Sequence, residues 1–169
     1  MNNPSTRSAP GAACIRPNST VPNTTSSRPD TAARTRAHTR WKTVAGLTPA
    51  QASWTDKSGN HSVGQLANHL VFWDRESLAK FKGETPAKFS GNNDETFNSF
   101  DAKQWDATVK QLDQVLTDWE KAVESADDKK LAEWASTIAH IGAHNAYHIG
   151  QIIYVRKEQG SWDPSKGVK

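Results

Sequence analysis

Residues 138–151 read IAHIGAHNAYHIGQ and place three of the six histidines at steps of four: His140, His144 and His148. On an α-helix, residues four apart lie on one face, with Cβ atoms about 5–6 Å apart. Two such imidazoles can share one zinc ion, because Zn–N bonds are about 2.0–2.1 Å long. His140 and His148 are two turns apart, about 12 Å along the axis, which is too far for both to bind one ion. The stretch therefore predicts a helix that supplies two metal ligands, with a third ligand from elsewhere in the fold.

Other interpretations of these histidines are weaker. A polar stripe on a helix surface is disfavoured by the isoleucines around them, at positions 138, 141, 149, 152 and 153. Protease chemistry of the His-Glu-x-x-His type is disfavoured because Asn145, which cannot ionise, stands at the position of the general base. Haem ligation by two histidines fits poorly, because an i,i+4 pair on one helix suits one facial site and not opposite axial positions.

Composition indicates one globular domain with an unusual N-terminal segment. Residues 1–40 hold six arginines and one acid, whereas the rest of the 169 residues holds fifteen Lys/Arg and seventeen Asp/Glu. The slightly acidic domain gives no sign of nucleic-acid binding. No apolar run is long enough to span a bilayer, and no apolar region follows the first residues as in a secretory signal. With Cys14 as the one cysteine, we expect a cytoplasmic protein without membrane contact.

The Arg- and Ser-rich residues 1–40 carry almost no large apolar side chains, so they cannot bury enough surface to offset the entropy of ordering. We expect a disordered tail; a transit peptide and a wrongly assigned reading-frame start are the alternatives. The domain is then expected over residues 41–162, with residues 163–169 as a flexible C-terminus.

Apolar periodicity predicts the helices of the domain. Thr48-Pro49-Ala50-Gln51 has a capping-box pattern for a short helix, and Ser62 to Gln65 repeats it before a longer helix that ends near Gly83. Further helices are expected over about 101–125 and 129–158. The long polar connection 84–100 is typical of a functional loop, for example a lid.

His69 lies within the helix that starts after Ser62, between apolar neighbours. A lone histidine in such a place is usually a packed residue, but the histidine pair on the later helix needs a third ligand. Glu76, two turns further along the same side, is a candidate for a supporting carboxylate, and a solvent-facing charge is an equal alternative.

Residues 62–73, SVGQLANHLVFW, followed by residues 144–156, HNAYHIGQIIYVR, resemble the DinB/YfiT-like family. The resemblance covers about residues 41–162. It implies an all-α, up-down-down-up four-helix bundle with a divalent metal, zinc or nickel, held by three histidines. Matched residue by residue, these are His69, His144 and His148. His140 is then an extra neighbour, with Tyr147 and Gln151 near the site or packed in the bundle.

The same resemblance implies a metal-dependent enzyme that acts on a small molecule, as a thiol-dependent transferase using a low-molecular-weight thiol or as a hydrolase. The alternative is a non-catalytic, stress-associated metal-binding bundle that acts through a partner. No individual catalytic residue can be named at this point.

The sequence departs from the family at the first helix, which is truncated or degenerate here, because the Arg-rich face of Ala32–Lys42 would not fill a core. Without that helix the remaining three would expose a hydrophobic groove, which favours self-association, for example as a homodimer.

Overall fold

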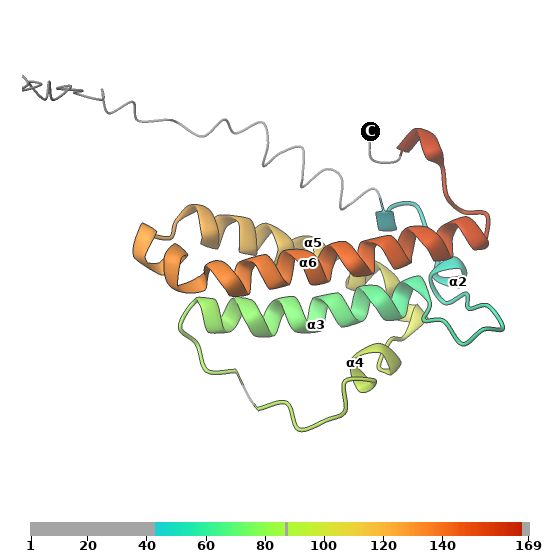
Figure 1. Cartoon of the computed structure of the whole chain (residues 1–169). Coiled ribbons are helices and arrows are strands. Elements are labelled where there is room, and N and C mark those ends of the chain that lie inside the picture. Colours follow the sequence, from blue (N-terminus) through green and yellow to red (C-terminus); the bar gives the residue numbers. More distant parts are fainter. Residues whose placement is uncertain (1–42, 87, 167–169) are drawn as a thin grey trace, which may run out of the picture.

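The structure is a computed structural model that describes residues 43–86 and 88–166, and these residues form helices with no strand among them. The three long helices are α3 (Val63–Phe81), α5 (Trp105–Glu124) and α6 (Asp128–Glu158), and α3 packs against both others (Figure 1). The short elements are α2 (Pro49–Ala52), α4 (Glu95–Asn98), and the 3₁₀ turns η1 (Ala102–Gln104) and η2 (Pro164–Lys166). The predicted all-α class is confirmed.

Aromatic contacts establish the direction of the three long helices. Phe81, the last residue of α3, packs on Trp119 in the second half of α5 and on Trp134 near the start of α6, each with ring centroids 5.2 Å apart. Helices α3 and α5 are therefore parallel, and α6 runs opposite to both. This is the down-down-up part of the predicted bundle. The segment Ala32–Lys42, where the first helix of the family was expected to be truncated or degenerate, and the tail over residues 1–40 lie outside the described residues.

Local signals start and stop α3 where the sequence predicts. The Ser62 hydroxyl accepts from the Gln65 amide at 3.2 Å, and the Gln65 side-chain oxygen accepts from the Ser62 amide at 2.9 Å. These bonds satisfy donors that have no partner within the helix. At the other end Gly83 has φ +85°, which favours glycine, and the Glu84 amide donates to the Ala79 carbonyl at 2.9 Å.

One predicted helix boundary differs from the structure. The helix expected from Asp101 begins at Trp105, because the Asp101 carboxylate accepts from the Lys103 amide at 2.9 Å and favours a 3₁₀ turn first. In the C-terminal segment expected to be flexible, residues 164–166 form the turn η2.

The connection from α3 to α5 has to return along the bundle, because the two helices are parallel. It passes beside α3 (Figure 1) and carries α4. Phe89 packs on Phe72 with ring centroids 4.8 Å apart, and Phe100 packs on Trp105 at 6.1 Å. These aromatic contacts hold the connection against the bundle, close to the middle of α3.

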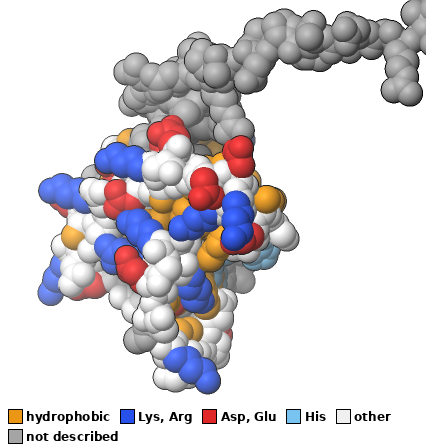
Figure 2. Space-filling view, turned by 90° about the vertical axis from the view of Figure 1, so that its left-hand side faces the viewer, with side chains coloured by type: hydrophobic (Ala, Val, Ile, Leu, Met, Phe, Trp, Pro, Cys, Tyr) orange, Lys and Arg blue, Asp and Glu red, His pale blue; other side chains and the backbone are white. Residues whose placement is uncertain are grey.

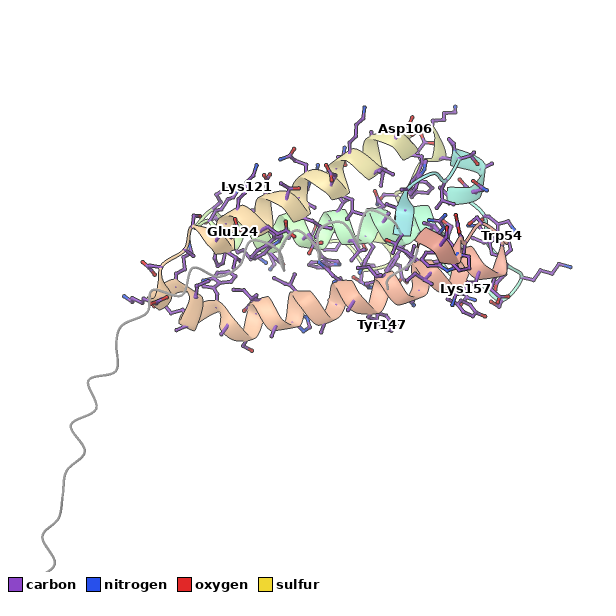
Figure 3. All side chains as sticks on the ribbon, turned by 90° about the horizontal axis from the view of Figure 1, so that it is seen from above. Trp54, Asp106, Lys121, Glu124, Tyr147 and Lys157 are labelled. Atoms are coloured by element: carbon purple, nitrogen blue, oxygen red, sulfur yellow. The ribbon has the colours of Figure 1, made fainter. Side chains whose placement is uncertain are left out.

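The core consists of buried apolar side chains from α3, α5 and α6, together with residues next to α2. Its largest fully buried members include Trp105, Leu66, Ile152, Val44 and Val63. Charged side chains such as Asp106 and Lys121 lie on the outer edge of α5 (Figure 3). On the face at the α5–α6 turn, basic and acidic side chains alternate (Figure 2). None of the helices in the described part of the chain has the length and apolarity needed to cross a membrane.

Candidate metal centre

The three histidines predicted as ligands meet between α3 and α6. The Nε2 atom of His144 lies 3.2 Å from Nε2 of His69 and 3.1 Å from Nε2 of His148. One ring nitrogen from each residue falls within 4.8 Å of the others. The structure therefore brings together one side chain from α3 and two from α6, as the i,i+4 spacing requires.

This arrangement fits a divalent ion. Nitrogens bonded at about 2.0–2.1 Å in tetrahedral geometry lie about 3.3 Å from one another. The observed separations of 3.1 and 3.2 Å are close to that value, so small ring movements would suffice to bind an ion. Three imidazoles are a donor set that suits zinc, nickel and related metals. The three histidines are thus placed closely enough to hold one ion.

His69 is held by the connection between α3 and α5. Its Nδ1 atom lies 2.6 Å from the Thr96 hydroxyl, and its ring stacks on Phe97 with centroids 3.8 Å apart. His61 stacks on the same phenylalanine at 4.0 Å. Nothing in the sequence pattern placed Thr96, Phe97 or His61 beside His69, because their proximity depends on how the connection folds back.

His148 is held by its own helix. Its Nδ1 atom lies 2.7 Å from the Gln151 side-chain oxygen, and the Gln151 amide nitrogen donates to the Tyr147 hydroxyl at 3.3 Å. The Gln151 oxygen can only accept, so the proton of neutral His148 is on Nδ1 and the lone pair is on Nε2. Second contacts of this kind orient a ligating ring and fix its tautomer. The family resemblance left Tyr147 and Gln151 either near the site or packed in the bundle, and these contacts place them beside the site.

The histidines border a cavity of about 490 Å³. Its other walls include aromatic and polar side chains: Trp73, Asp74, Ser77, Asn93, Phe97, His140, Ile141 and Tyr147. His140 is exposed and lines this cavity, but it does not belong to the group of three converging histidines. Helix geometry excluded only a site shared by His140 and His148, and the family resemblance made His140 an extra neighbour; its place outside the group agrees with that assignment.

The carboxylate in the cavity wall belongs to Asp74, and Glu76 does not line it. Asp74 is 2% exposed, and both of its carboxylate oxygens lie 3.2 Å from the side-chain nitrogen of Asn145. This contact joins α3 to α6 beside His144. A signal for Asp74 did exist in the sequence, since it occupies the apolar stripe between Leu70 and Leu78, where a charge needs a partner.

A comparison with known protein families assigns the chain to one of them. A family model described as the DinB superfamily matches residues 31–152. The chain belongs to the DinB superfamily. This confirms the family predicted from the two histidine-bearing stretches. The match begins ten residues before the domain boundary expected at Trp41. Searches of curated protein sequences and of solved structures returned no match.

The environment of this DinB-superfamily site keeps its histidines neutral. Burial lowers the pKa of His69 to about 3, and the nearby imidazoles of His148 and His144 act in the same direction. Burial also lowers the pKa of His144 and that of His148; a hydrogen bond to Gln151 partly opposes the shift of His148. At neutral pH all three rings are unprotonated at one nitrogen, which is the form that binds a metal.

We expect the chelator-treated protein to lose stability as the pH falls from about 6.5 toward 3. The pKa of His69 is below its ordinary value in the folded state, so the unfolded chain binds more protons over this range and acid favours unfolding. Urea unfolding followed by tryptophan fluorescence at several pH values measures this slope. His69→Asn, which removes the most strongly shifted group, should reduce it, and an unchanged acid slope in that variant would contradict the assignment.

Proposed function

We propose that this DinB-superfamily protein is a metal-dependent enzyme, a thiol-dependent transferase or a hydrolase that acts on a small molecule. His69, His144 and His148 would hold a divalent ion, with zinc and nickel as the candidates. The observation that supports this best is the position of the three converging nitrogens, which lie at the wall of a cavity and not inside the packed core.

The size of the cavity supports a small-molecule substrate. Ligand sites usually occupy about 300–1,000 Å³, and this cavity has about 490 Å³. Three protein ligands leave a further coordination position free, as in catalytic and not structural metal sites. A divalent ion held there supplies Lewis acidity and lowers the pKa of a water or thiol that binds to it.

The side chains around the histidines have distinct parts in this proposal. Trp73 and Phe97 give the cavity apolar, aromatic walls, which exclude water and orient the organic part of a substrate. Tyr147 is 63% exposed, lies on the outer edge of α6 (Figure 3) and also lines the cavity. The exposed His140 lines the same cavity, where an imidazole can exchange protons between the site and solvent.

We expect metal-dependent turnover when the protein, purified without a His-tag and loaded with zinc or nickel, is tested on a panel of substrates. Glutathione, cysteine, bacillithiol and mycothiol with electrophilic acceptors test transfer, and activated esters and amides test hydrolysis. The rate should rise with pH as the nucleophile deprotonates.

A chelator and His144→Ala should each remove the activity, whereas an exposed substitution on α5, Lys121→Ala, should leave it unchanged. A folded, metal-loaded protein that is inactive across the whole panel would contradict the enzyme proposal and favour the non-catalytic bundle that acts through a partner.

A further inference from the structure

The imidazole ring of one of the three histidines is in contact with residues outside the long helices. His69 belongs to α3, but its Nδ1 atom lies 2.6 Å from the hydroxyl of Thr96 in α4. Thr96 is 3% exposed, so this contact is shielded from solvent. The neighbouring Phe97 covers the face of the ring, with an interplanar angle of 9°. The connection between α3 and α5 thus touches both an edge and a face of this imidazole.

The hydrogen-bond chain beyond Thr96 fixes where the protons are. The Thr96 hydroxyl also lies 2.6 Å from the backbone carbonyl of Asn93. A carbonyl cannot donate, so the single hydroxyl proton of Thr96 points to Asn93. The Thr96 oxygen must then accept from His69, and a neutral imidazole with its proton on Nδ1 carries a lone pair on Nε2. That Nε2 atom faces His144 at 3.2 Å.

From this chain we infer that Thr96 is a positioning residue that holds His69 in the tautomer and ring orientation required for metal binding. Without the hydroxyl, the imidazole proton is free to occupy Nε2, where it points into the cluster and blocks the ligating lone pair. The inference deepens the proposed function, since it concerns the same site, but its first test needs no metal.

Helix α3 itself places Thr96. The side-chain nitrogen of Asn68, the residue before His69, donates to the Thr96 carbonyl at 2.7 Å and to the Ser99 hydroxyl at 2.9 Å. Asn68 and His69 therefore contact the same short segment. Asn68 anchors the segment to α3, and the segment in turn orients His69.

The tautomer can be read directly in the full-length, metal-free protein labelled with ¹⁵N, from long-range ¹H–¹⁵N spectra of the histidine rings. We expect the His69 proton on Nδ1 in the wild type. Thr96→Val, which keeps the shape but removes the hydroxyl, should populate the form with the proton on Nε2. Thr96→Ser should restore the wild-type spectrum. Asp94→Ala, an exposed substitution beside α4 whose side chain makes no cap bond to that helix, should leave it unchanged.

Zinc and nickel affinities, measured by competition with a chromophoric chelator, provide the second readout. Thr96→Val should weaken binding about 10–100-fold, as the loss of second contacts to metal ligands typically does. Thr96→Ser and Asp94→Ala should bind nearly as well as the wild type. If none of the proteins binds metal, the proposed function fails while the tautomer measurement still tests the role of Thr96.

A wild-type spectrum with the His69 proton on Nε2 would overturn the inference, even if the valine variant does not fold. A folded Thr96→Val protein with the wild-type tautomer would overturn it as well.

Discussion

Replacing His144 by alanine is expected to abolish stoichiometric binding of zinc or nickel. Its Nε2 atom lies between the other two, 3.2 Å from that of His69 and 3.1 Å from that of His148. Without it, two ligands on different helices remain, and the loss of affinity should exceed the roughly 10–100-fold cost of losing a second contact. Elemental analysis of protein purified without a His-tag and isothermal titration calorimetry measure the stoichiometry and the Kd.

His140→Ala is the matched control for this experiment. His140 is one turn from His144 on the same helix and borders the same cavity, but it lies outside the converging group. This variant should retain most of the metal. Equal losses in the His140 and His144 variants would show that the ligand set is wrong, as would full metal content in a protein that lacks both His144 and His148.

The largest loss of stability is expected for Trp105→Ala, at about 3–5 kcal/mol. Trp105 begins α5 and is 2% exposed, and its indole nitrogen donates to the Leu47 carbonyl at 2.9 Å. Truncation would leave a cavity where α5 meets the segment before α2, and it would leave the Leu47 carbonyl without this donor. Urea unfolding at neutral pH with chelator present measures the change in the free energy of unfolding.

Trp105→Phe separates the two contributions. It keeps most of the aromatic volume and loses the hydrogen bond, which should cost about 1–3 kcal/mol for a buried acceptor left unsatisfied. An exposed substitution on the same helix, Lys121→Ala, should change stability by less than about 0.5 kcal/mol. A Trp105→Ala protein no less stable than Trp105→Phe would mean that the indole does not fill the core as the structure indicates.

The long helices could be predicted from sequence because their signals are local. The capping box at Ser62 and the acid Asp127, whose carboxylate accepts from the Lys130 amide at 2.7 Å, mark helix starts within a few residues. Helix α4 was not predictable in this way, because four residues are too few to show a period of 3.6 and, unlike α2, it has no side-chain cap at its start. It is held by tertiary contacts such as the bond from Asn68 to the Thr96 carbonyl.

The residues of the site also differ in whether local sequence signals predict them. Spacing on one helix predicts a ligand pair that includes His144. The choice of His148 over His140, and of His69 as the third ligand, rests on the family resemblance, since periodicity does not say which helices become neighbours. Thr96 is reached only when the connection folds back over α3, so no sequence period contains it. Glu76, for which a supporting carboxylate and a solvent-facing charge were equal alternatives, lies outside the cavity lining, because the apolar stripe of α3 turns Asp74 inward instead.

His69 and His144 are 75 positions apart in the sequence, and a shared ion would cross-link the helices that carry them. An ion that binds the folded chain alone adds about 2.7 kcal/mol at a free concentration of 100 times its Kd, which lowers the unfolded fraction about 100-fold. Cleavage by cellular proteases usually follows the population of opened molecules. The lifetime of this protein in a cell would then be set by the supply of free metal, and scarcity of the ion would remove the protein along with its activity.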